Sequence, residues 1–483
     1  MFISICFVSG LMAQDIEVSS SGQKLTNKIS KFRLLGKVGS NYVVERYGSD
    51  KHIFDIYSSK LSYKASKEFL LEKNQTFHKT WLLPDGGWIS FVEKEKDFAV
   101  LKTVQVDENF KIADKQQVLD TIYERPDLVT SNIRSKKSLN ESHTVFYLPV
   151  FDNGDVDYFL VHVYDRKMNL VQTQKLSQEV IKESGFADLE VFNDGSFVAI
   201  FQQTDEKPEH SGDVSYALFY SSIEGDVQEY EYQPQDAVFK KPKFEIDNAN
   251  NTLLIAGFYQ YEYSKKKSIA ADRFFSEQID LQTGETTATT VEEFSDEFYF
   301  ELTGNEEETE PKILYTFYVK EIIAKADGGM LVIAESFYKD QEESYNNSLF
   351  SSPTYSNYVP VEVYHYNDIV VYDIDDSGEI ETPRLIYKRQ TSQDDRGSYS
   401  SFYTMNGQDN LRLLYMSAIE QNATLDEFIY TPDEQNNPST VFNVGAKDVF
   451  PIVKMSIQTA PNELIIPSFE NNQVSIIRMT YSQ

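Results

Sequence analysis

Cysteine is almost absent from this sequence. The one cysteine, Cys6, lies in an apolar segment at the N-terminus, so the remainder of the chain can form no disulfide and offers no thiol chemistry. Tryptophan is scarce as well, with two residues among 483. Beyond the N-terminal segment, no apolar run approaches the ~20 residues that a membrane-spanning helix needs. The sequence therefore excludes disulfide-stapled, thiol-dependent and helical membrane classes.

Positive charge is also in short supply. The chain carries 45 lysines and arginines against 76 aspartates and glutamates, a net charge of −31. Such a surface repels phosphate backbones and anionic lipids, which argues against nucleic-acid and membrane-surface partners. The balance favours a soluble extracellular protein, although an acidic surface is also compatible with Ca²⁺ or with a basic partner.

Recognisable catalytic and metal-binding motifs are missing too. The six histidines have no metal-ligand spacing, and the sequence contains no nucleophile elbow, P-loop or dinucleotide fingerprint. Residues 373–378 begin like a calcium loop, but Arg384 stands where that loop requires a glutamate. With 76 acidic residues, the sequence cannot nominate the carboxylate pair of a glycosidase. We therefore expect no cofactor and no metal site, and Ca²⁺ lacks a complete motif.

The N-terminal apolar segment has the character of a secretory signal. Residues 1–12 are mostly apolar, and a cleavage site is predicted after Ala13, with residues 1–13 as the signal. Leu11, at the third position before the cleavage point, departs from the usual small residue. Export without cysteine suits a bacterial envelope or secreted protein, so we expect a secreted or periplasmic location.

The abundant residues are aromatic, and they recur in a repeated phrase. The chain has 31 tyrosines and 33 phenylalanines, which favour strands. Eight times, a tight polar turn precedes an apolar strand, as in Asp85-Gly86-Gly87 before Trp88, Asn193-Asp194-Gly195 before Phe197, and Asp327-Gly328-Gly329 before Met330. A period of roughly 45 to 55 residues, with two enlarged units, is typical of propeller blades.

Each repeat has room for four strands, because a second turn and an outer strand follow the first hairpin. The predicted fold is all-β: one closed β-propeller of four-stranded antiparallel blades over residues 14–483, with eight blades, or seven as the alternative. The last repeat lacks its outermost strand. Residues 16–18, or the segment around Leu25, are predicted to supply it and so to close the ring.

Long loops in this arrangement gather on one face. In a propeller, the links between the second and third strands and the links between blades share a face, and here four consecutive units carry long segments there. The largest is an inserted tyrosine-rich loop at about residues 338–366, a composition typical of binding loops. The candidate ligand-binding residues are Tyr345, Tyr355, Tyr358, Tyr364, His365, Tyr366 and Arg396. The alternative is that these tyrosines only form a small core for the insertion itself.

Three segments support a resemblance. The Ala13-Gln14 processing site, the stretch from His365 to Val371, and Lys388-Arg389-Gln390 before a polar segment resemble uncharacterised secreted proteins of the Bacteroidetes type. The resemblance implies a β-rich, propeller-like fold and an envelope location. It carries over no functional residues.

These observations favour an exported, non-catalytic propeller that binds a protein or glycan through its loop-rich face. One alternative is a carbohydrate-active hydrolase with carboxylates at the mouth of the central channel, about 5 to 10 Å apart, beside an arginine such as Arg396. The other is a structural component of an envelope assembly, which would expose a broad apolar patch.

Overall fold

A computed structural model gives the architecture of the chain. It describes residues 13–19, 22–123, 125–152, 155–177, 181, 184–204, 214–233, 238–239, 242–260, 273–303, 317–345, 358–407, 410–420, 422–431, 437–447 and 449–481. The cleavage region before Ala13, including Cys6, lies outside these residues.

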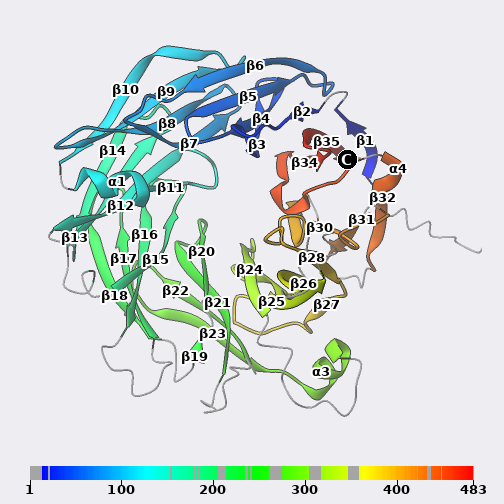
Figure 1. Ribbon diagram of the computed structural model, residues 1–483. Helices are drawn as coiled ribbons and strands as arrows, with labels where there is room; N and C mark the ends of the chain where they lie inside the picture. Colours follow the sequence, from blue (N-terminus) through cyan, green and yellow to red (C-terminus); the bar gives the residue numbers. More distant parts are fainter. Residues whose placement is uncertain are drawn as a thin grey trace, which may run out of the picture.

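The described strands form eight antiparallel sheets, and in seven of them the strands are neighbours in the chain. Figure 1 shows the sheets arranged around a central space, with the chain colour advancing from blue through green to red around the ring. We number the sheets as blades 1 to 8, starting from the first complete sheet in the chain. The prediction of an all-β propeller with eight rather than seven blades is confirmed.

The first four blades have regular strand order. Blade 1 comprises β3 (Lys31–Val38), β4 (Asn41–Tyr47), β5 (Lys51–Tyr57) and β6 (Tyr63–Leu70). Blade 2 comprises β7 (Gln75–Leu83), β8 (Gly86–Lys94), β9 (Ala99–Asp107) and β10 (Ile112–Ile122). Blade 3 comprises β11 (Arg134–Lys137), β12 (His143–Asp152), β13 (Asp155–Asp165) and β14 (Leu170–Leu176). Blade 4 comprises β15 (Ser184–Val191), β16 (Phe197–Thr204), β17 (Val214–Ser221) and β18 (Val227–Tyr232).

Blades 5 and 6 each carry an additional strand segment, as does blade 8. Blade 5 comprises β19 (Val238–Phe239) and β20 (Lys243–Asp247), both paired with β21 (Thr252–Gln260), then β22 (Arg273–Asp280) and β23 (Thr286–Glu293). Blade 6 comprises β24 (Phe317–Ala324), β25 (Met330–Tyr345) and β26 (Tyr358–Ile374), with both β27 (Arg384–Ile386) and β28 (Gln390–Gln393) beside β26. Blade 7 comprises β29 (Phe402–Asn406), β30 (Leu411–Met416), β31 (Thr424–Tyr430) and β32 (Ser439–Asn443).

Blade 8 combines the two ends of the described chain. Its strands β33 (Ile457–Ala460), β34 (Glu463–Glu470) and β35 (Gln473–Tyr481) are completed by β1 (Ala13–Val18) and β2 (Gln23–Lys24), which both pair with β35. The register places Ile16 opposite Met479 and Val18 opposite Ile477. In Figure 1 the blue β1 lies beside the red C-terminal strands. This pairing confirms the predicted closing strand. Without β1, the outer edge of β35 would present unpaired backbone groups.

Eight hydrophobic clusters fill the spaces between successive blades, one for each neighbouring pair, blades 8 and 1 included. Strand alternation produces this arrangement, since successive side chains point to opposite faces of a sheet. In β4, for example, Val43 packs towards blade 2, whereas Tyr42 and Val44 pack towards blade 8. Both faces of a blade are therefore apolar, which explains the unbroken apolar phrase in the sequence.

The tight turn of each phrase joins the first strand of a blade to the second. In blade 4, Gly195 has φ +96°, a left-handed conformation that glycine adopts without strain. The Asp194 carboxylate accepts hydrogen bonds from both the backbone N–H (2.9 Å) and the hydroxyl (2.6 Å) of Ser196. This local chemistry fixes the turn.

All of these turns lie on one face of the ring, because strands within a blade are antiparallel. The opposite, loop-rich face receives the blade-to-blade connections, including α1 (Pro126–Asn132), α3 (Asp296–Thr303), α4 (Val444–Lys447) and the 3₁₀ helix η2 (Val453–Met455). None of the helices in the described ranges is long and apolar enough to cross a membrane.

Candidate functional site

The predicted insertion begins as an extended ribbon on blade 6. Strands β25 and β26 have 16 and 17 residues, about three times the usual length of a strand. Their pairing shifts between Glu335 and Phe337, then continues from Phe337 opposite Tyr366 to Tyr345 opposite Tyr358. The residues beyond the shift lead away from the blade core on the loop-rich side. The flanks of the predicted loop are therefore paired strands.

The structure gathers three of the predicted site residues in β26. Tyr364, His365 and Tyr366 lie between β25 on one side and β28 on the other. Alternation places Tyr364 and Tyr366 on one face of this three-stranded segment and His365 on the other. Tyr345 and Tyr358 face each other in register at the far end of the ribbon, and Tyr355 lies outside the described residues.

The His365 face presents a stacked aromatic pair. The His365 and Tyr338 rings have centroids 4.3 Å apart and planes within 11°. His365 Nδ1 lies 3.3 Å from the Thr391 hydroxyl, and its Nε2 lies 3.7 Å from the Asp340 carboxylate. Asp340 is exposed, so this face combines flat rings with an accessible carboxylate.

The opposite face carries a charged and aromatic group around Tyr364. The Tyr364 hydroxyl donates a 2.5 Å hydrogen bond to Glu362. Lys339 pairs with the same carboxylate and lies 5.6 Å above the Tyr364 ring. This hydrogen bond from Lys339 holds the pKa of Glu362 below its usual range. Arg396, in the exposed turn after β28, contributes a further favourable charge to the same carboxylate.

Tyr366 lies deeper, at the base of the ribbon. Its ring centroid is 4.6 Å from that of Phe337, and the Lys320 and Lys454 ammonium groups lie 5.5 and 5.7 Å from it. A Cβ atom at Gly397 would overlap the Tyr366 ring, so glycine is required there. Burial raises the pKa of Tyr366. The structure therefore does not bring the predicted residues into one group: His365 lies on one face of the ribbon, Tyr364 and Arg396 are near Glu362 on the other, and Tyr366 is half-buried at the base.

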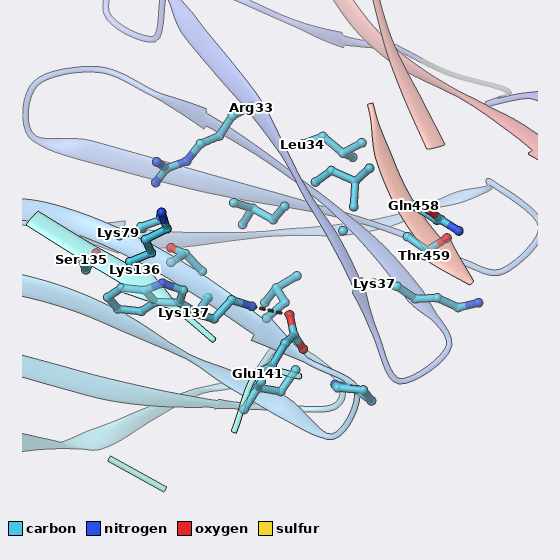
Figure 2. Close-up of a pocket in the computed structure, with 18 residues that line it drawn as sticks. Arg33, Leu34, Lys37, Lys79, Ser135, Lys136, Lys137, Glu141, Gln458 and Thr459 are labelled. Carbon is cyan, nitrogen blue, oxygen red and sulfur yellow. Dashed lines mark hydrogen bonds and ion pairs between the residues drawn. The ribbon is translucent and has the colours of Figure 1, made fainter. Parts of the chain in front are cut away.

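A cavity of about 510 Å³ in the central channel was not foreseen from the sequence. It is lined by parts of β3, β7, β11 and β33. Five basic side chains line it, namely Arg33, Lys37, Lys79, Lys136 and Lys137 (Figure 2). A usable signal existed, because these residues all precede the first tight turn in three consecutive repeats.

Within the described ranges, no group of three or more histidines, cysteines and carboxylates is placed to hold a metal ion. The expectation of no cofactor stays a prediction.

Comparison with known proteins gives similarity to solved structures alone. No protein-family model matches the chain, and no curated protein sequence is similar to it. A protein from Lactobacillus plantarum matches with 12% identity and a TM-score of 0.35, over 86% of this chain and 97% of that chain. An uncharacterised protein from Listeria monocytogenes matches with 9% identity and a TM-score of 0.36, over 86% and 99%. Prolyl oligopeptidase B from Galerina marginata matches with 7% identity and a TM-score of 0.40, over 91% of this chain and 55% of its own. Likeness at these scores carries no argument about function.

Proposed function

We propose that this chain is an exported, non-catalytic β-propeller that binds a glycan or protein through its loop-rich face. The observation that supports the proposal is the ribbon of β25 and β26, which extends well past the paired core of blade 6. Extended loops on a rigid scaffold are common binding elements, since the scaffold fixes their position while their sequence sets the specificity.

The chemistry of the ribbon fits a sugar-containing ligand. Aromatic rings such as Tyr338 and His365 offer flat apolar contact at low entropy cost. The exposed side chains of Asp340, Gln341 and Glu342 add hydrogen-bond acceptors that match sugar hydroxyls. The Glu362 carboxylate is occupied by Lys339 and Tyr364, an arrangement that suits a binding surface better than a general acid.

The test is a screen of the purified chain against an array of bacterial and plant polysaccharide fragments. The double variant Tyr338→Ala/His365→Ala removes the stacked rings, and Tyr123→Ala, an exposed tyrosine of the outer part of blade 2, is the matched control. We expect the double variant to lose about tenfold in affinity or more, and the control to bind like the parent.

Equal binding by parent and double variant would move the site away from the ribbon. If no polysaccharide fragment binds, while a purified envelope protein binds the parent and not the double variant, the ligand is a protein. Export is tested separately, by mass spectrometry of the protein collected outside the cytoplasm of a bacterial host. The predicted product begins at Gln14.

A further inference from the structure

The cavity in the central channel has a charge opposite to that of the molecule. Its lining contains five basic residues and one acidic residue, Glu141, in a chain of net charge −31. Uniform scattering of 45 basic and 76 acidic residues would give the reverse balance. Low-dielectric walls concentrate the field of such a group within the cavity.

Four of the five cations have a carboxylate partner. Lys137 pairs with Glu141 in the lining, as the dashed line in Figure 2 shows. The other three partners do not line the cavity: Arg33 pairs with Glu45 (2.5 Å), Lys37 with Glu463 (3.1 Å), and Lys136 with Glu190. These carboxylates fix the positions of the three cations and offset most of their charge.

Lys79 differs from the others, because none of the described carboxylates lies within ion-pair distance of it. Figure 2 shows Lys79 and Arg33 on the same side of the cavity, and the Arg33 charge acts on the Lys79 amino group. Burial lowers the pKa of Lys79, and the neighbouring charges of Arg33, Lys137 and Lys136 lower it further. Burial and the same surroundings lower the pKa of the adjacent His78 to about 4. Lys79 is therefore the cation of this lining whose charge no described carboxylate offsets directly.

Two further polar atoms in the wall have unused hydrogen-bonding capacity. The Thr80 hydroxyl and the Trp81 indole N–H belong to side chains that are 6% and 3% exposed, and both line the cavity. Neither atom has a hydrogen-bond partner among the described residues. Both atoms are buried beneath the wall, so their lack of a partner is a cost to the fold and not a contact for an occupant.

The rest of the lining indicates the size and character of an occupant. Leu34, Leu82 and Ile457 also line the cavity and add apolar atoms to its wall. A volume of about 510 Å³ lies within the range of small-molecule sites. An inorganic ion alone would leave most of this space and its apolar wall unfilled.

We propose that the cavity between β3, β7, β11 and β33 binds a small organic anion with two or more negative charges, such as a phosphate monoester or a polycarboxylate. Lys79 makes the principal contact, because its charge is available. Arg33 and Lys136 flank the anionic group, and the leucine side chains contact the carbon skeleton. This site is independent of the ribbon and of the function proposed for it.

Calorimetric titration of the full chain tests the site, with glucose 6-phosphate and citrate as the two probes and neutral glucose as the reference. We expect at least one probe to bind with a Kd below about 1 mM, and glucose to give no heat of binding. The affinity should fall as NaCl rises from about 50 to about 300 mM. Binding of glucose 6-phosphate alone assigns the site to phosphate esters, and binding of citrate alone assigns it to polycarboxylates.

The variant Lys79→Gln should weaken that binding about tenfold or more, whereas Lys79→Arg should keep most of it. Lys175→Gln changes an exposed lysine on the outer strand of blade 3 and should bind like the parent. Because Lys79 has no described ion-pair partner, Lys79→Gln is expected to fold, which circular dichroism checks. Failure of both probes to bind, equal binding by Lys79→Gln, or equal binding of glucose would each overturn the proposal.

Discussion

Lys388 and Glu335 form a fully buried ion pair at the base of the ribbon, with Lys388 Nζ 2.8 Å from the Glu335 carboxylate and neither side chain exposed. The Ser401 hydroxyl donates a 2.6 Å hydrogen bond to Glu335, and Lys388 donates to the backbone carbonyl of Tyr366 at 2.9 Å. The pair therefore ties β25, β26 and the segment after β28 together beneath the candidate ligand face.

Removing one partner of this ion pair should strongly destabilise the fold. We expect Lys388→Met to lower the free energy of unfolding by about 3–5 kcal/mol, because it leaves a buried carboxylate without its cation. Urea denaturation measures the change. Lys339→Met, which breaks the exposed pair with Glu362, is the matched control and should cost at most about 1 kcal/mol. Similar losses in the two variants would contradict the assignment of a buried, structurally important pair.

The closing strand gives a second prediction. Deletion of residues 1–24 removes β1 and β2 and exposes the edge of β35, so the variant should melt at a lower temperature and self-associate. Deletion of residues 1–12, which precede β1, should leave the melting temperature unchanged. Scanning calorimetry and light scattering separate the two. A ring that keeps its full stability without β1 would show that blade 8 does not need the strand.

Lys79→Gln should increase stability at neutral pH, in contrast to most changes of a buried residue. The folded state lowers the pKa of Lys79, so its charge destabilises the fold below that pKa, and the penalty disappears as the pH rises past the ordinary lysine value. Lys37→Gln is the matched comparison and should destabilise, because it removes the ion-pair partner of the Glu463 carboxylate. Chemical denaturation at pH 7 checks both, and a loss of stability in Lys79→Gln would show that its charge is compensated.

Mild acid should stabilise this protein. Burial raises the pKa of Glu190, and the neighbouring carboxylates of Glu245 and Asp188 raise it further against the opposing charge of Lys136. Burial likewise raises the pKa of Glu321. A carboxyl group with a raised folded pKa stabilises the fold most below its ordinary value, near 4.5, and this contribution is lost as the pH rises through the raised value.

The free energy of unfolding should accordingly be higher at about pH 5.5 than at about pH 8. Glu190→Gln should flatten this dependence, while Asp127→Asn, a change of an exposed acid, should not. Denaturation curves across the range give the slope directly. A parent slope of the opposite sign would mean that these carboxylates stay ionised throughout.

Much of the fold was predictable because the blade repeats its local chemistry. Turns such as Asp194-Gly195 can be recognised in the sequence. The unbroken apolar run after each turn indicates a second strand that is buried on both faces. The closing role of residues 16–18 followed from an incomplete last repeat.

The candidate site was less predictable than the fold. Tyr366 resembles its neighbours in sequence, yet it is half-buried against Phe337, and only the pairing of β25 with β26 distinguishes it from His365. The sequence does not show that Lys79 and Arg33 line the same cavity. They lie on the first strands of two neighbouring blades, and the closure of the ring brings those strands to the central channel.

Blade 8 also sets the order of events during synthesis, because it is built from the first and the last described strands. At about 5–20 residues per second, the synthesis of β1 precedes that of β35 by roughly half a minute to a minute and a half. Throughout that interval, seven blades can form in turn while the eighth has no partner for its opening strand. Closure is therefore the last step of folding, and until then the chain remains an open-ended series of hairpins rather than a locked ring.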